Sequence, residues 1–138
     1  MLPRWTLALL AGTALFTAPA VAIAGPCYDD ADPSEITALL ADTTDGEPLI
    51  LDVRTPGEFH SRGGHIDGAV LLPVSELASR IEELSHLKDR EIIVVCRSGN
   101  RSAVAARTLC DHGFTNVTNL AGGMNSWARA GQPITTSR

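Results

Sequence analysis

The feature that most constrains the fold is a short apolar run that ends at a cysteine and a polar loop. Residues 92–95 are all β-branched, a pattern typical of a strand buried on both faces of a parallel sheet. Cys96 follows, then a loop over 97–101 and the start of a helical pattern at 102–107. Open α/β sheets place ligand sites at the carboxyl ends of their strands, so this order predicts a thiol that faces the amino end of a helix.

The rest of the chain alternates strand and helix patterns. This alternation predicts one α/β domain, with a central, mostly parallel sheet of about five strands and helices on both faces. Asp32 to Glu35 has the residues of a helix start, with a capping Asp, a Pro at the first position and a Glu at the third. Strands are expected at 48–53, 69–72, 91–95 and 116–120, helices from Pro33, around 77–84, over 101–113 and 122–131, and a polar, glycine-rich loop at 54–64.

The first 24 residues have the pattern of a secretory signal peptide. One charge, Arg4, precedes an apolar stretch from Trp5 to about Phe16, and Ala22-Ile23-Ala24 has a small-x-small cleavage pattern. The apolar stretch is too short and too interrupted for a typical membrane-spanning helix. An uncleaved amino-terminal anchor is the alternative. We expect cleavage after Ala24 and a periplasmic or secreted protein with no stable membrane association.

Cleavage would leave 114 residues, enough for one modest domain. The removed segment has one Arg and no acids, so the formal charge would change from −5 to −6. A net-acidic protein argues against nucleic-acid binding, which depends on basic residues that neutralise phosphates. We expect a monomer with a short N-terminal segment at 25–31, the domain at 32–134 and a C-terminal tail at 135–138.

Three cysteines, Cys27, Cys96 and Cys110, are too few for a disulfide scaffold. Exported thiols tend to pair, and a Cys27–Cys110 disulfide is an alternative that the sequence leaves open. Because Cys110 lies inside a helix pattern, we expect it instead to be a buried structural thiol. The four histidines have no metal-ligand spacing with cysteines or acids, so no metal site is expected.

The loop after Cys96 has the composition of an anion site. A helix amino end offers free N–H groups and a partial positive charge, which bind anions and lower the pKa of a cysteine. Gly99 and Asn100 tolerate backbone angles that turn successive N–H groups toward one anion, and Arg97 and Arg101 add full positive charge. A thiol packed in a core needs no such loop, so we interpret Cys96 as a nucleophilic thiolate.

Cysteine-based phosphatases also hold an anion between a strand and a helix. Their signature has an Arg six positions after the cysteine, whereas here Ser102 occupies that position and the Arg comes one residue earlier. The loop is therefore one residue short for a phosphate, which argues against phosphatase activity.

Further motifs are spread over most of the chain. They are Asp52-Val53-Arg54, Glu58-Phe59, Gly64-His65-Ile66-x-Gly68-Ala69, Leu72-Pro73, Gly113-Phe114, Asn116-Val117 and Leu120-x-Gly122-Gly123-Met124-x-x-Trp127. With the loop, they resemble a single-domain rhodanese, a family of sulfurtransferases, from about Asp32 to Pro133. Asp67 departs from the pattern, because the family commonly has Pro there, and His65 matches a position that usually orders a loop.

The resemblance implies a ping-pong reaction at Cys96. Its thiolate would take the sulfane sulfur of thiosulfate or a similar small anionic donor as a persulfide, which a thiol or cyanide acceptor then removes. The residues agree with this chemistry, since a thiolate and fixed N–H groups need little acid–base help. No metal or organic cofactor is expected. The expected substrate-binding residues are Arg97, Ser98, Gly99, Asn100, Arg101 and Ser102.

Charged residues near the loop are expected to support it. Arg97 is expected to face the anionic end of the donor, and a cation there resembles thiosulfate-using members of the family. Arg101 lies where the helix begins, and Asp52, at the end of a neighbouring strand, is the carboxylate expected to pair with it. Arg54 and Glu58 are expected to form a second ion pair beside the pocket.

The alternative to catalysis is a module that binds a partner, or one that relays sulfur or redox equivalents through Cys96. Many rhodanese-like domains lack the cysteine and act as interaction modules, so the presence of Cys96 favours chemistry. The resemblance leaves the physiological donor and acceptor open.

Overall fold

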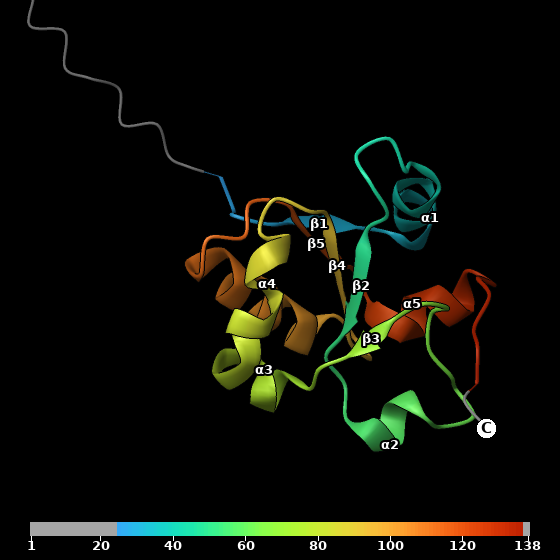
Figure 1. The fold of residues 1–138 in the computed structure, drawn as a ribbon. Coiled ribbons are helices and arrows are strands. Elements are labelled where there is room, and N and C mark those ends of the chain that lie inside the picture. The colour runs from blue at the N-terminus through green and yellow to red at the C-terminus, as the bar shows by residue number, and fades with distance from the viewer. Residues whose placement is uncertain (1–24, 137–138) are drawn as a thin grey trace, which may run out of the picture.

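A computed structural model describes residues 25–136 (Figure 1), and the expected signal peptide lies outside this range. The strands are β1 (Asp29–Ala31), β2 (Leu49–Asp52), β3 (Val70–Leu71), β4 (Ile92–Val95) and β5 (Val117–Leu120). The helices are α1 (Pro33–Ala41), α2 (Pro56–Phe59), α3 (Val74–Arg80), the 3-10 helix η1 (Ile81–Leu87), α4 (Asn100–Asp111) and α5 (Gly123–Arg129). None of the helices in the described range is long and apolar enough to cross a bilayer.

The five strands form one parallel sheet in the order β1-β5-β4-β2-β3, with β4 at its centre. Side chains of α3, η1 and α4 pack on one face, and those of α1 and α5 pack on the other (Figure 1). The predicted fold class, an α/β domain with helices on both faces of the sheet, is confirmed.

Residues of β4 alternate between the two faces and enter two separate cores. Ile92 and Val94 belong to the core on the α4 side, and Ile93 and Val95 belong to the core on the α1 and α5 side. All four are fully buried, and each such side chain contributes about 1.5–3 kcal/mol. The register of β4 is given by its pairing on both sides, with β2 and with β5, and this pairing places Cys96 directly after the end of the strand.

The ordered fold extends past the expected domain limits of 32 and 134. Asp29–Ala31 forms the edge strand β1 beside β5, and Thr135 pairs with His65 in an isolated antiparallel bridge. A three-residue strand that contains two acids has no strand pattern of its own, because aspartate is depleted in strands. Only its pairing with β5 makes it a strand.

Helix α2 lies inside the segment expected to be a loop. The N–H of Thr55 donates to Glu58 Oε2 at 3.0 Å, and the N–H of Glu58 donates to Thr55 Oγ1 at 3.3 Å. Thr55-Pro56-Gly57-Glu58 is a capping-box sequence with proline at the first position. The same signal at Asp32 correctly predicted the start of α1, so the start of α2 was predictable too.

Cys110 is not the buried thiol expected from the helix pattern. It is half-buried and forms a disulfide with Cys27, with the two Cα atoms 6.0 Å apart, an ordinary separation for this bond. The disulfide joins the segment before β1 to the carboxyl end of α4, across 83 positions of sequence. The pairing of β1 with β5 brings these residues together, and sequence spacing carries no information about such a long-range contact.

Candidate active site

Cys96 is the first residue after β4, and it has no exposed surface. Its Sγ accepts a hydrogen bond from the N–H of Gly99 at 3.0 Å and one from the hydroxyl of Ser102 at 3.2 Å. Both donors belong to the loop and the first turn of α4. Two donors on one sulfur favour its negatively charged form, because hydrogen bonds to an ionised acceptor are the stronger kind.

The balance of two opposing effects sets the pKa of Cys96. Burial raises the pKa of the thiol, because a charged sulfur would lose its hydration. The Ser102 hydroxyl and the backbone N–H groups of Ser102, Ser98 and Gly99 act against burial and hold the pKa of Cys96 below its usual value. The loop therefore favours a thiolate in a site from which water is excluded.

Helix α5 holds the other side of the loop. The N–H of Met124 donates to the carbonyl of Cys96 at 2.8 Å, and the N–H of Asn125 donates to the carbonyl of Arg97 at 3.0 Å. This close approach requires Gly123, because a Cβ there would lie 2.4 Å from the Cys96 carbonyl oxygen. Gly99, with φ of +96°, similarly packs against the backbone of Gly122, which a Cβ on Gly99 would approach to 3.0 Å.

The six expected substrate-binding residues divide into two groups. Gly99 and Ser102 are buried and contact Cys96 itself, and the Ser102 hydroxyl also lies 3.2 Å from the Gly99 carbonyl oxygen. These two residues therefore support the sulfur. The other four have exposed or half-buried side chains: Arg97, Ser98, Asn100 and Arg101. Of these, Arg97 lines the pocket beside the loop, and Arg101 is paired with Glu58.

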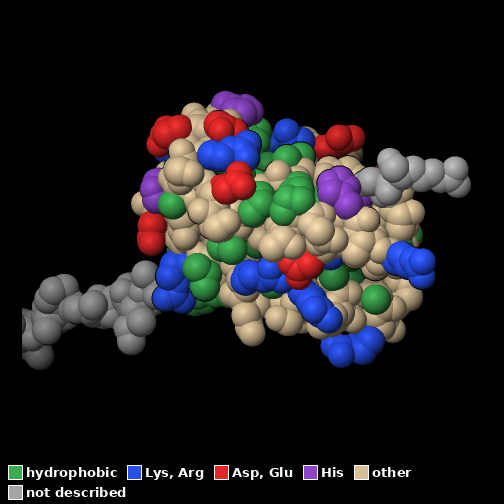
Figure 2. Space-filling model, turned by 90° about the horizontal axis from the view of Figure 1, so that it is seen from below, with side chains coloured by type: hydrophobic (Ala, Val, Ile, Leu, Met, Phe, Trp, Pro, Cys, Tyr) green, Lys and Arg blue, Asp and Glu red, His purple; other side chains and the backbone are tan. Residues whose placement is uncertain are grey.

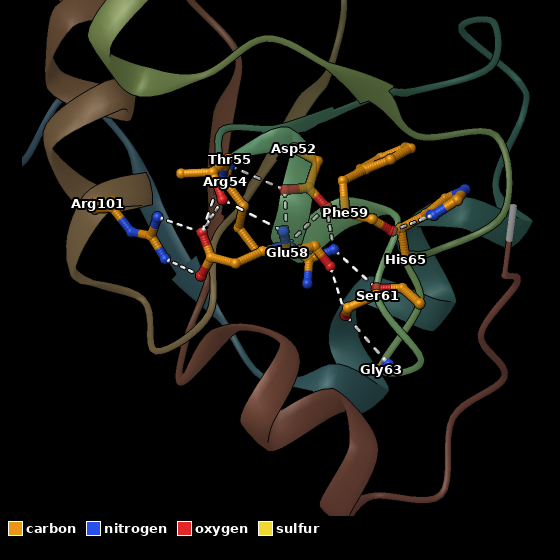
Figure 3. Close-up of polar contacts among 10 residues, drawn as sticks. Asp52, Arg54, Thr55, Glu58, Phe59, Ser61, Gly63, His65 and Arg101 are labelled. Atoms are coloured by element: carbon orange, nitrogen blue, oxygen red, sulfur yellow. Dashed lines mark hydrogen bonds and ion pairs between the residues drawn. The ribbon is translucent and has the colours of Figure 1, made fainter.

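The four charged residues beside the loop form two ion pairs, but not in the combination expected from the sequence (Figure 3). Arg54 pairs with Asp52, with Nε 2.9 Å from Oδ1 and Nη2 2.7 Å from Oδ2, and both side chains are buried. Arg101 pairs with Glu58, with Nη1 2.8 Å from Oε2 and Nη2 2.6 Å from Oε1. The expected Asp52–Arg101 and Arg54–Glu58 pairs are therefore wrong.

The exchange of partners has a local cause. Asp52 and Arg54 are two residues apart where the chain leaves β2, and Arg54 Nη2 also donates to the Gly64 carbonyl at 2.9 Å. The α2 turn fixes the Glu58 carboxylate against Thr55, on the side where Arg101 begins α4 (Figure 3). Hydrogen bonds from Arg101 lower the pKa of Glu58 to about 2. The sequence pattern predicts a loop for this segment, and a loop gives the Glu58 side chain no defined direction.

Ring stacking orders the segment that follows α2. His65 is buried, and its ring stacks on the ring of Phe59 with the two centroids 3.7 Å apart. Its Nδ1 lies 3.1 Å from the Phe59 carbonyl oxygen (Figure 3). These contacts agree with the loop-ordering role that the resemblance implied for His65. Within residues 25–136, no three histidine, cysteine or acidic side chains gather as metal ligands would.

A pocket of about 580 Å³ lies beside the loop, with residues of α2 and its flanks on one side and α5 on the other. Three charged residues line it: Arg54, Glu58 and Arg97. Arg54 is paired with Asp52 and Glu58 with Arg101, so Arg97 is the lining charge that forms no ion pair within the described range. Figure 2 shows the molecule from below, with several Lys and Arg side chains across the lower half of the view and acidic side chains mainly in its upper half. This local positive charge, in a chain of net charge −5, favours an anionic ligand.

The fold and the site together define an α/β domain in which the loop between β4 and α4 donates hydrogen bonds to a buried cysteine sulfur and lowers its pKa. Residues 33–130 match the rhodanese-like domain family, and the chain belongs to that family. The family that the motifs indicate is thereby confirmed.

Two relatives and one solved structure illustrate the similarity. A sulfurtransferase from Allochromatium vinosum is 40% identical over 106 residues, which cover 77% of this chain and 94% of that protein. The thiosulfate sulfurtransferase GlpE from Shewanella oneidensis is 41% identical over 81 residues, 59% of this chain and 76% of that protein. The crystal structure of a rhodanese-related protein from Thermoplasma volcanium matches with a TM-score of 0.68 at 29% identity, covering 80% of this chain and all of the other.

Proposed function

We propose that the protein is an exported sulfurtransferase that moves a sulfane sulfur from thiosulfate, or a similar small anion, to a thiol or cyanide through a persulfide on Cys96. The observation that carries the proposal is the pair of hydrogen bonds on the Cys96 sulfur, from Gly99 and Ser102. They lower the pKa of Cys96 and so favour its thiolate form, and a thiolate is the nucleophile that sulfur transfer requires.

In the first half-reaction, the Cys96 thiolate attacks the outer sulfur of thiosulfate. A bond forms between Sγ and that sulfur, the sulfur–sulfur bond of the donor breaks, and sulfite leaves with the electron pair. Arg97 would hold the anionic end of the donor from the mouth of the pocket. Because Cys96 has no exposed surface, binding of the donor must displace side chains at the rim of the loop.

In the second half-reaction, the acceptor attacks the outer sulfur of the persulfide. With cyanide, a carbon–sulfur bond forms, the bond to Sγ breaks, and thiocyanate leaves as the Cys96 thiolate is regenerated. Neither step needs a proton donor, an external oxidant or a metal.

Export is supported by the disulfide between Cys27 and Cys110. Disulfides form and persist in oxidising compartments and are rare in the cytosol. The bond also occupies the two other cysteines of the chain, so Cys96 is its one free thiol.

Intact mass and turnover together test the proposal. Incubation of the purified protein with thiosulfate is expected to add one sulfur, about 32 Da, as covalent catalysis requires. Cyanide is then expected to remove it and form thiocyanate. Because Cys96 is the one free thiol, the adduct can be assigned without digestion, and Cys96→Ser is the control that must lose both adduct and turnover.

Absence of both adduct and thiocyanate in folded, reduced Cys96 protein would overturn thiosulfate as the donor. A second donor such as mercaptopyruvate would then separate donor choice from function. If no donor loads Cys96, the partner-binding alternative replaces catalysis.

A further inference from the structure

Asn119 is a polar residue in an apolar place. It lies in β5, 3% exposed, on the face covered by α4, and it pairs in register with Val94 of the central strand. Its Nδ2 donates to Asp30 Oδ1 at 2.7 Å, but its Oδ1 is the one buried side-chain oxygen or nitrogen in the described range that has no hydrogen-bond partner. An unpaired buried carbonyl lowers stability, so an asparagine here needs a reason other than packing.

The amide of Asn119 reaches the active-site loop. Its Nδ2 lies 3.5 Å from the carbonyl oxygen of Gly99, the atom that also lies 3.2 Å from the Ser102 hydroxyl. Gly99 has φ of +96°, and its own N–H is a donor to the Cys96 sulfur. The Gly99 carbonyl also accepts the first hydrogen bond of α4, from the N–H of Ala103 at 3.1 Å. Asn119 is a further donor to this carbonyl, and a fixed carbonyl restricts the backbone of Gly99, which glycine would otherwise leave free to rotate.

The same amide is held from the edge of the sheet. Asp30 stands opposite Asn119 in the register of β1 and β5, and the N–H of Ala121 donates to the Ala31 carbonyl at 2.9 Å. A three-residue edge strand is weakly held by its own ladder. The disulfide fixes the segment just before it to α4. In Figure 1, β1 runs along β5 at the side of the sheet away from β2.

We propose that Asn119 is a positioning residue for Cys96, that it acts through the Gly99 carbonyl, and that Asp30 and the Cys27–Cys110 disulfide hold it in place from β1. The proposal rests on the proposed function only in taking Cys96 as the nucleophile. Its test therefore measures the reactivity of the thiol and not sulfur transfer.

The first test is the rate of Cys96 alkylation by iodoacetamide as a function of pH, in the oxidised full chain. Asn119→Ala is expected to raise the apparent pKa of the thiol and to slow alkylation at neutral pH by about threefold to tenfold, the size of one hydrogen bond. Asn116→Ala removes an exposed amide just before β5 and is expected to leave the profile unchanged. Circular dichroism and thermal unfolding show whether each variant is folded.

Asp30 is exposed, so its substitution does not disturb the core. Its two possible effects, through charge and through Asn119, change the pKa of Cys96 in opposite directions. Asp30→Ala removes a negative charge, which by itself would lower the pKa of Cys96. If Asp30 instead orients Asn119, the same variant raises the pKa and slows alkylation. Asp30→Asn keeps an oxygen that can accept from Asn119 and is expected to restore the wild-type rate. The other charged groups around the loop stay unchanged in these variants: Asp52, Arg54, Glu58, Arg97 and Arg101.

The disulfide is tested by coupling. Cys27→Ser with Cys110→Ser leaves Cys96 as the one cysteine and is expected to slow its alkylation by about twofold. In an Asp30→Ala background, the same pair of substitutions is expected to cause no further slowing, because contacts that act through one residue are not additive.

The proposal is overturned if Asn119→Ala keeps the wild-type pH profile, or if Asp30→Ala lowers the pKa of the thiol. These outcomes are independent of sulfur transfer. A shifted alkylation profile in a protein that transfers no sulfur removes the proposed function and keeps Asn119 as a positioning residue. Sulfur transfer with an unshifted profile does the reverse.

Discussion

The two ends of helix α4 hold two cysteines in opposite chemical states. At the amino end, Cys96 is fully buried and free, and donors of the loop surround its sulfur. Near the carboxyl end, Cys110 is half-buried and bonded to Cys27. The more deeply buried cysteine is therefore the one with a stabilised thiolate, and the more exposed one is held in a disulfide and cannot react as a thiol.

The difference shows that local partners, and not burial alone, decide the chemistry of each thiol: Cys110 has Cys27 beside it, and Cys96 has the donors of the loop. N–H groups without helical partners point out of the amino end and stabilise a negative sulfur. Carbonyl groups point out of the carboxyl end and would destabilise one. Burial raises the pKa of Cys96, and only the donors of the loop reverse that effect. Four variants test this comparison.

The largest effect is expected from removing the disulfide near the carboxyl end of α4. Replacing Cys27 and Cys110 together by Ser should lower the free energy of unfolding by about 3 kcal/mol, because the bond restricts a long loop of the unfolded chain. Urea unfolding of the oxidised protein and of this variant measures the change, and wild-type protein with a reductant is the matched control. An unchanged midpoint would mean that the disulfide contributes nothing to stability.

The next largest effect is expected from disturbing the packing of α5 on the loop at the amino end of α4. Gly123→Ala would place a Cβ 2.4 Å from the Cys96 carbonyl oxygen on a residue with φ of +57°. We expect a loss of about 2–3 kcal/mol in unfolding free energy, with lower reactivity of Cys96. Gly131→Ala is the matched control, because Gly131 has φ of +70° but no heavy atom within 4 Å of the added Cβ. Its expected loss is about 1 kcal/mol. Equal losses in the two variants would contradict the close packing of α5 on the loop.

A smaller effect sharpens the comparison at the sulfur itself. Ser102→Ala removes the hydroxyl 3.2 Å from Cys96 Sγ, and the pKa of the thiol should rise because the thiolate loses a hydrogen-bond donor. Alkylation at pH below that pKa should slow by about tenfold. Ser75→Ala, on the exposed side of α3, should have no effect. If the Ser102 variant alkylates at the wild-type rate, the backbone donors alone stabilise the thiolate.

The smallest effect concerns the ion pair that joins α2 to the amino end of α4. Arg101 lowers the pKa of Glu58 from 4.5 to about 2. A carboxylate with a lowered folded-state pKa stabilises the fold above its unfolded pKa, and that contribution is lost as the pH falls through the folded value. Stability should therefore fall between about pH 4.5 and pH 2 by about 1 kcal/mol, after allowance for solvent screening.

Glu58→Gln should flatten that part of the pH profile in chemical unfolding. The exposed Glu82 of η1 offers the matched control, Glu82→Gln, which should keep the wild-type slope. An identical slope in all three proteins would show that the Glu58–Arg101 pair does not contribute to folding stability.

Local signals predicted local structure well, and failures arose where a partner lies far away in sequence. The capping residues at Asp32 and the apolar run at 92–95 correctly predicted α1 and β4. The same capping signal at Thr55 indicates α2, and its omission led to the wrong partner for Arg101. The sequence gives no signal for the role of Asn119, because nothing in β5 shows that its amide will meet Gly99 and Asp30.

The sequence by itself determined the family, the alternation of strands and helices, and a cysteine at the join of a buried strand and a helix. Those features depend on neighbours within a few residues, where periodicity, capping and glycine conformation act. The tertiary structure decided which carboxylate meets which arginine, that Cys27 reaches Cys110, and that the edge strand supports the loop of Cys96. Those contacts join residues that come together only when the sheet assembles. The free energy of each contact depends on a distance in space, and the order of residues along the chain does not give that distance.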